Sequence, residues 1–170
     1  EPQPVTLQLT YDPNVPTTRG EETFIVFPDG NVAADHLVPS AASNAHAIAK
    51  GVTVAPTTAY VHSVYAKAGA YTKLGLREGV TTSAYAAFDL TNGTVLASGS
   101  GGTGLIEALA GGWYRCILLA TTAGGQTTFG ERVHVLSPSY TTGAVDAAWT
   151  GDGTSGLYVW GSQLEAGAFP

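Results

Sequence analysis

The chain has 170 residues, the size of one domain, and it contains no apolar run long enough to span a bilayer. Only 12% of the residues are charged while 44% are hydrophobic, so its surface must be finished largely with Thr, Ser, Gly and Asn. Thirteen acidic and seven basic side chains give a net charge of −6, which disfavours both a nucleic-acid partner and insertion into or binding to an anionic membrane.

The first 20 residues differ in character from the rest. They hold four prolines and one short alternating stretch, Val5, Leu7 and Leu9. Because proline removes a hydrogen-bond donor from a β-ladder, residues 1–20 are predicted to form an extended arm or linker with at most one edge strand. Residues 21–170 are predicted to form one globular domain.

From Glu21 onward, short apolar or alternating runs are separated by glycine and polar turns, a pattern typical of an all-β sandwich or barrel. Nine such runs fit two packed antiparallel sheets. The predicted strands are Thr23–Phe27, Thr58–Ala68, Thr72–Arg77, Ala84–Leu90, Thr94–Ala97, Trp113–Ala120, Thr128–Leu136, Ala144–Trp149 and Gly156–Glu165.

Two local signals refine this pattern. Asn92-Gly93 lies between β-forming residues and predicts a type I′ turn, so that Phe88–Leu90 pairs with Thr94–Leu96 as a hairpin. The alanine-rich segment Val32–Lys50 is the place predicted for a short helix, with Ser40 or Ser43 as its N-cap.

Metal binding has few candidates in this sequence. The four histidines are far apart and lack the spacing of a helical zinc site, which favours structural or surface roles. Asp29 and Asp152 lie in Asp-Gly loops and are candidates for a structural calcium site, but neither loop has the EF-hand spacing, so simple turns are the alternative. No other cofactor is expected. Cys116 lies in the apolar run WYRCILLA and is interpreted as a small buried hydrophobic residue.

The sequence has no nucleophile elbow and no carboxylate pair that spacing can assign, so an enzyme is not predicted. One stretch, YAKAGAYTKLGLRE from Tyr65 to Glu78, resembles the tyrosine strand of jelly-roll alginate lyases. In those enzymes a Tyr works with a His, an Arg and a Gln to abstract a proton next to a carboxylate. The strands expected to carry the His and Arg are not visible here.

Aromatic side chains are the remaining candidates for binding, because flat rings suit the C–H faces of sugars. Strict alternation in GLYVWGSQLE places Trp160 on the more apolar face, so Trp160 is predicted to lie in the core while Gln163 and Glu165 point outward. In WYRCIL, the same argument predicts that Trp113 and Arg115 form an exposed pair. The core face of that strand is predicted to hold Tyr114, Cys116 and Leu118.

Four segments in this order resemble a known family: YVHSVYAKAG, FDLTNGTVL, GGWYRCIL and GDGTSGLYVWGSQLEAGAFP. They are similar to the jelly-roll domain, itself similar to carbohydrate-binding modules, that recurs in tail fibres and in head spikes or fibres of tailed bacteriophages. The resemblance covers roughly residues 21–170. It implies a two-sheet jelly roll on a virion surface, extracellular once released, that contacts other virion proteins and host glycans.

We therefore expect a non-enzymatic virion domain, present as a homo-oligomer or in many copies on a particle, that binds host-surface polysaccharide weakly at each site and gains affinity by avidity. The candidate contacts are Trp113, Arg115, Tyr140 and Trp149. One alternative is a structural virion module that packs against neighbouring subunits without a ligand. A second alternative is a polysaccharide lyase using Tyr65 or Tyr71 with a histidine.

Overall fold

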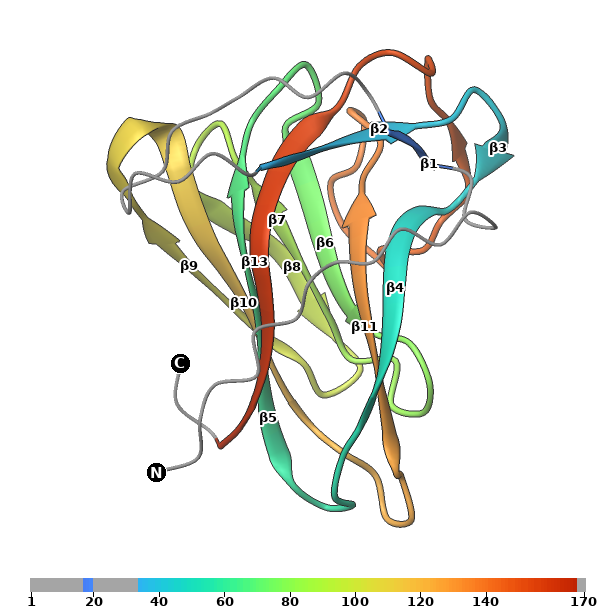
Figure 1. Cartoon of the computed structure of the whole chain (residues 1–170), viewed down its shortest axis with the longest axis vertical. Helices are drawn as coiled ribbons and strands as arrows, with labels where there is room; N and C mark the ends of the chain where they lie inside the picture. The colour runs from blue at the N-terminus through green and yellow to red at the C-terminus, as the bar shows by residue number, and fades with distance from the viewer. Residues whose placement is uncertain (1–16, 20–33, 168–170) are drawn as a thin grey trace.

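The computed structural model describes residues 17–19 and 34–167, which form an all-β domain of two antiparallel sheets packed as a sandwich (Figure 1). The six-stranded sheet has the order β1-β2-β13-β5-β10-β9 and the five-stranded sheet the order β4-β11-β6-β7-β8, while β12 and β3 form a separate two-stranded ribbon. The strands are β1 Thr17–Arg19, β2 Asp35–Pro39, β3 Ser43–Asn44, β4 His46–Thr53, β5 Ala59–Lys67, β6 Lys73–Glu78, β7 Tyr85–Asp89, β8 Thr94–Gly99, β9 Thr103–Ala108, β10 Trp113–Thr121, β11 Thr128–Val135, β12 Trp149–Thr150 and β13 Leu157–Ala166, and one 3₁₀ turn spans Ala110–Gly112. The predicted two-sheet antiparallel sandwich is confirmed.

Alternating apolar residues of both sheets meet between the layers. Val64 of β5 and Leu118 of β10 are fully buried on the inner side of the six-stranded sheet, against Leu74 of β6 and Phe88 of β7 on the other. Burial of one such side chain contributes about 1.5–3 kcal/mol. Cys116 is fully buried in the same cluster, which confirms its interpretation as a small core residue.

The predicted hairpin is present as β7 and β8, but its turn is longer than predicted. Pairing ends at Asp89 and Thr94, which leaves a four-residue loop, and of the Asn92-Gly93 pair only Gly93 has a positive φ, of 65°. The Asp89 carboxylate accepts the N–H of Thr91 at 2.8 Å, and the Asp89 carbonyl accepts the N–H of Gly93 at 2.9 Å. The type I′ prediction is therefore wrong, because Asp89 holds the backbone in a wider turn.

The predicted helix in Val32–Lys50 is also wrong. Its described part, from residue 34, forms β2, β3 and the start of β4, and β4 pairs over its whole length with β11. Alanine favours helices only through local propensity, and pairing against a buried neighbouring strand outweighs that preference.

The chain after β11 covers the outward side of the five-stranded sheet. Val145 packs there on Leu136 and Ala87, and Gly75 permits this approach, because a Cβ at that position would lie 2.8 Å from the Cβ of Val145. Residues 144–148 are therefore not strand, and of the predicted strand Ala144–Trp149 only Trp149 is in one, β12. The predicted strand Thr23–Phe27 lies outside the described residues.

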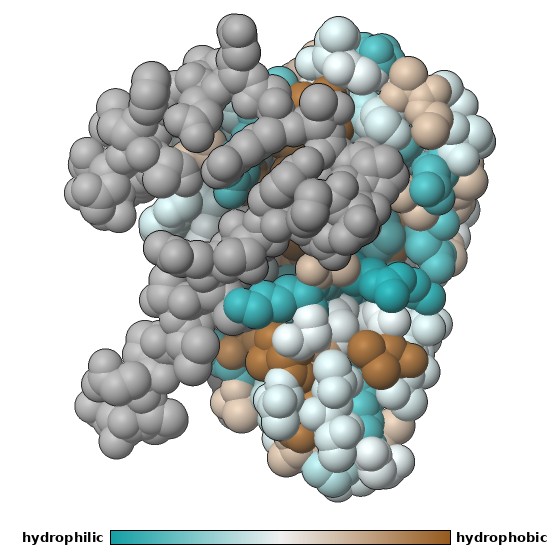
Figure 2. Space-filling view, turned by 45° about the vertical axis from the view of Figure 1, so that its right-hand side comes forward, coloured by the Kyte–Doolittle hydropathy of each residue, from teal (hydrophilic) through white to brown (hydrophobic). Residues whose placement is uncertain are grey.

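The two sheets end in four edge strands, β1, β9, β4 and β8. On the side that carries β4, the described surface mixes hydrophilic and hydrophobic residues (Figure 2). No helix in residues 17–19 and 34–167 is both long enough and apolar enough to cross a membrane.

Candidate functional site

The outward face of the six-stranded sheet gathers aromatic and polar side chains in two neighbouring rows. The first row crosses the sheet through residues of β10, β5, β13 and β2, and the second through β9, β10, β5 and β13. Directly opposed residues of an antiparallel pair share a face, so each row lies on one side of the sheet. The first row is Trp113, Lys67, Tyr158 and His36, and the second is Glu107, Arg115, Tyr65 and Trp160.

A β-bulge in β13 determines which side chains of this strand face outward. Trp160 opposes Tyr65 and Gln163 opposes Ser63, so three steps on β13 match two on β5. Gly161 supplies the extra residue in a left-handed conformation, with φ 59°. One inserted residue shifts the alternation, so Trp160 and Gln163 both face outward.

The predicted core position of Trp160 is therefore wrong. Trp160 is half-buried on the outer face, where its ring centroid lies 5.1 Å from that of Tyr65 at an interplanar angle of 42°. The residues of this strand that face the core are instead Leu157 and Val159. Gln163 and Glu165 point outward as predicted, and Glu165 is exposed.

A second aromatic contact lies in the first row. The ring of His36 stacks on Tyr158, with centroids 4.7 Å apart and planes 23° apart. Burial lowers the pKa of His36, although a hydrogen bond with the Gly156 backbone opposes the shift, so the imidazole is neutral at pH 7.

Arg115 opposes Tyr65 across the β10–β5 ladder, on the side of Tyr65 away from Trp160. Its Nη1 is 3.7 Å from Oε2 of Glu107, and the side chains of these residues are 19% and 53% exposed. At this distance the pair is an ion pair without a short hydrogen bond. The arginine Nε is buried and has no hydrogen-bond partner among the described residues.

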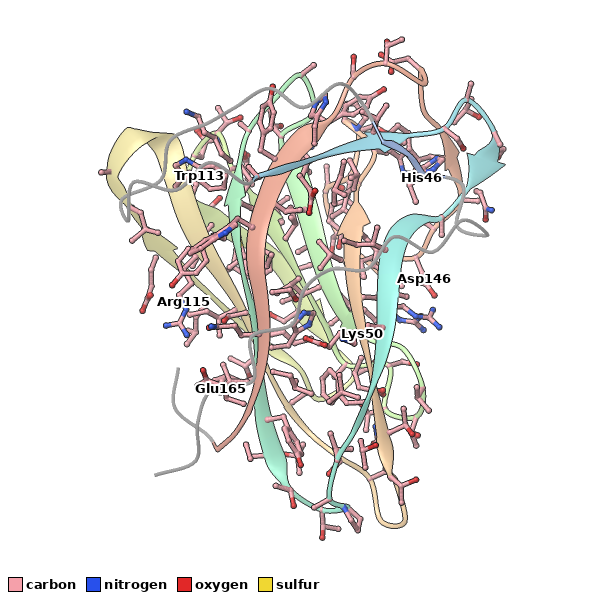
Figure 3. The ribbon with its side chains drawn as sticks, viewed as in Figure 1. His46, Lys50, Trp113, Arg115, Asp146 and Glu165 are labelled. Carbon is pink, nitrogen blue, oxygen red and sulfur yellow. The ribbon has the colours of Figure 1, made fainter. Side chains whose placement is uncertain are left out.

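The four predicted sugar contacts do not meet at one place. Trp113 is only 4% exposed, so the predicted exposed pair with Arg115 is wrong for the tryptophan. Arg115 is partly exposed on the outward face of the six-stranded sheet. Figure 3 shows Trp113, Arg115 and Glu165 along one side of the molecule, with His46 and Asp146 on the other.

Tyr140 and Trp149 have framework contacts elsewhere. Tyr140 packs against the cluster on the outward side of the five-stranded sheet, and its hydroxyl donates to the carbonyl of Gly143. Burial raises the pKa of Tyr140 to about 12. Trp149 is half-buried between His46 and Tyr71, at centroid distances of 5.0 and 5.3 Å, and its indole N–H donates to a backbone carbonyl.

The calcium candidates gain no support from the described geometry. The Oδ1 atom of Asp152 accepts hydrogen bonds from the backbone N–H groups of Thr154 at 2.9 Å and Ser155 at 2.7 Å. This pattern is that of the simple turn given above as the alternative to a calcium site. Those hydrogen bonds hold the pKa of the Asp152 carboxyl well below its usual range. Asp29 lies outside the described residues, and the described ranges hold no group of three or more metal-ligating side chains.

A buried polar cluster lies between the sheets. His62 of β5 contacts Ser162 of β13, with Nε2 and Oγ 3.2 Å apart, and Oε1 of Glu131 of β11 lies 3.5 Å from the same nitrogen. A catalytic triad places its nucleophile and its acid on different imidazole nitrogens. Here both groups approach Nε2, and Nδ1 is unpartnered among the described residues, so the arrangement is not that of a triad.

Burial sets the ionisation of this cluster. It lowers the pKa of His62 to about 3 and raises that of Glu131 to about 7. The nearby charge of Lys50 and a hydrogen bond with Ser162 oppose the shift of Glu131 without cancelling it. Between pH 3 and pH 7 the neutral imidazole and the carboxylic acid are therefore the favoured forms between the sheets.

Of the lyase candidates, Tyr65 and Arg115 are direct cross-strand partners on the outward face. His36 lies on the same face in the neighbouring row, on β2, with β13 between it and β5, whereas His62 points to the inner face of the same strand as Tyr65. Tyr71 contacts Trp149, in the cluster that also includes His46.

Sequence reasoning missed the contributions of Tyr65, Trp160, Tyr158 and His36 to one aromatic face. The available signal was Gly161, since an isolated glycine inside a strand pattern is typical of a bulge. Comparison of this chain with protein-family models and with curated proteins finds no match.

Proposed function

We propose that this chain is a non-enzymatic glycan-binding domain whose site is the outward face of the six-stranded sheet. The observation that carries the proposal is the half-buried Tyr65–Trp160 pair, with ring centroids 5.1 Å apart. On the same face Arg115 opposes Tyr65, and Gln163 follows Trp160 along β13. Aromatic rings of this kind pack against the apolar faces of sugars, while neighbouring guanidinium and amide groups bind hydroxyls. The proposal moves the site from Tyr140 and Trp149 to the rows around Tyr65.

We further propose that the domain is displayed in many copies on a phage virion, facing host-surface polysaccharide. This part rests on the sequence resemblance alone. A site on a sheet face offers few contacts to one sugar, and multivalent display raises the affinity by about 10² to 10⁴ without new contacts.

The test is a glycan array probed with the full chain fused to a multimerising partner. Trp160→Ala and Tyr65→Ala are expected to lose binding. Tyr140→Ala is the matched control, because its ring lies on the outward side of the other sheet and binding should be retained. Circular dichroism melts show whether each variant is folded.

Three outcomes would redirect the proposal. Loss of binding in Tyr140→Ala but not in folded Trp160→Ala would show that the site lies on the five-stranded sheet and not on the six-stranded sheet. Release of unsaturated sugar products from a bound polysaccharide would favour the lyase alternative. Absence of binding to every glycan at high valency would contradict a glycan-binding role.

The structural-module alternative has one specific observation in its favour. Val95 and Leu105 are 37% and 40% exposed, and they lie on β8 and β9, an edge strand of each sheet. Exposed apolar side chains beside unpaired strand edges are typical of packing surfaces. If the array is negative, substitution of both residues by Ser should weaken association of the chain with its neighbouring virion subunit.

A further inference from the structure

We infer that the glycan bound on this face carries a carboxylate, as uronic and sialic acids do, and that Arg115 is the residue that recognises it. The inference rests on the proposed glycan-binding function and adds the substrate class. It follows from an arginine whose buried Nε has no hydrogen-bond partner within the described part of the protein.

Arg115 presents a partly used guanidinium to the aromatic pair. It opposes Tyr65 across the β10–β5 ladder, so its side chain and the tyrosine ring lie on the same face. Glu107 approaches Nη1 at 3.7 Å, and Nε has no hydrogen-bond partner among the described residues. A carboxylate binds arginine best through two parallel N–H···O bonds, and the Glu107 contact supplies neither at short distance.

The surrounding charges also favour an acid. Lys67 lies two residues from Tyr65 on the same face of β5, so the two rows hold two cations against one carboxylate, that of Glu107. His36 adds no charge at pH 7, because burial lowers its pKa. Glu165 opposes Val61, four residues from Tyr65 along β5, which is roughly 13 Å away.

This local excess of positive charge stands in a protein with a net charge of −6. Burial of a cation costs free energy unless its N–H groups are hydrogen-bonded. A neutral ligand offers weaker compensation for that cost than an anion does. A sugar ring on the Tyr65–Trp160 pair would bring a ring carboxylate beside Arg115, where the anion completes the guanidinium's bonds. The positive charge of Arg115 and the Tyr65–Trp160 rings therefore both favour a sugar that carries a carboxylate.

The test compares polyglucuronic acid with its carboxyl-reduced counterpart, using the folded full chain as a multimeric fusion and biolayer interferometry at fixed salt. The wild type is expected to bind the acid at least about tenfold more tightly, the effect of one charge-assisted hydrogen-bond pair. Arg115→Gln should bring the two affinities together, because it should weaken binding to the acid far more than binding to the reduced polymer. Arg115→Lys, which keeps the charge but loses the fork, should retain only part of the preference.

Glu107→Gln is the informative partner variant. Among the described residues it removes the one carboxylate that forms an ion pair with Arg115, so binding to the acid should tighten severalfold and by more than binding to the reduced polymer. Polysialic acid provides the second acidic probe, with its carboxyl-reduced form as the neutral arm.

Two results separate this inference from the function on which it rests. Equal affinity for acidic and reduced polymers, lost together in Trp160→Ala, would overturn the carboxylate inference and leave glycan binding intact. An equally large effect of Arg115→Gln on both polymers would overturn it as well. If neither these polymers nor any arrayed glycan binds, the proposed function itself fails.

Discussion

Glu131 is expected to destabilise the folded protein at alkaline pH, so Glu131→Gln should stabilise it there. The carboxyl is buried between the sheets at 4% exposure, and burial raises its pKa from 4.5 to about 7. The folded state therefore keeps a proton that the unfolded state releases. Stability contributed by the protonated acid is complete below pH 4.5 and is lost as the pH rises through 7.

The size of the effect follows from the two pKa values. Each unit of pKa difference corresponds to about 1.4 kcal/mol, so ionisation of Glu131 costs about 3 kcal/mol at pH 8 and less than about 1 kcal/mol at pH 5. Glutamine has the same shape without the charge. The gain in unfolding free energy of Glu131→Gln over wild type should thus grow by about 2.5 kcal/mol between pH 5 and pH 8.

Urea unfolding at pH 5, 6, 7 and 8 measures this difference, and Glu78→Gln provides a control of opposite sign. Glu78 is the cross-strand partner of Glu131, but its carboxylate accepts the N–H groups of Val80 at 2.8 Å and Thr82 at 2.7 Å, among five hydrogen bonds in all. These bonds outweigh burial and lower its pKa. An amide nitrogen in place of one oxygen would face backbone donors, so Glu78→Gln should lose about 3 kcal/mol at pH 7. A pH-independent difference between Glu131→Gln and wild type would refute the reasoning.

Three further outcomes are expected. Gly161→Ala should lower the free energy of unfolding in urea by about 1–2 kcal/mol and weaken glycan binding. The φ of Gly161 is 59°, and the new Cβ would lie 3.2 Å from the Tyr65 ring. Unchanged stability and binding would contradict the role given to the bulge. Burial lowers the pKa of His62 to about 3 and that of His134 to about 4. The free energy of unfolding should therefore fall as the pH drops from 6.5 toward 4, by at most about 2.7 kcal/mol per pH unit from the two histidines together. An unfolding free energy of Glu131→Gln that stays constant from pH 6.5 to 5 would argue against neutral buried histidines. The Cys116 thiol is fully buried and its pKa is raised, so iodoacetamide at pH 8 should label it only in urea; rapid labelling of the native protein would be inconsistent with its position.

The sandwich was predictable from the sequence because most of its strands are alternating or apolar runs. Thr58–Ala68 and Trp113–Ala120, for example, match β5 and β10 to within one residue at each end. Local composition failed where tertiary pairing decides the structure. The segment that forms β2 and β4 is rich in alanine, and its strand conformation depends on pairing with β13 and β11, which composition does not encode.

The candidate site was less predictable because it depends on one irregular backbone position. Strict alternation through Gly161 puts Trp160 and Gln163 on opposite faces, whereas the bulge puts them on the same face. The burial of Trp113 was missed for a related reason. The outward-facing residues Ile117 and Val61 are buried too, at 0% and 1% exposure, so alternation identifies a face without showing whether that face is exposed.

The same bulge links the two sides of the six-stranded sheet. By adding one residue opposite Val64, it turns Ser162 inward, where Oγ lies 3.2 Å from Nε2 of His62, while Trp160 stays outward against Tyr65. A change at Gly161 therefore disturbs a buried hydrogen bond and an aromatic contact together, and loss of binding in such a variant does not by itself locate the ligand. Substitutions confined to the outward face, at Tyr65 or Arg115, leave the His62–Ser162 contact in place, and their effect on affinity at constant stability is what identifies the binding face.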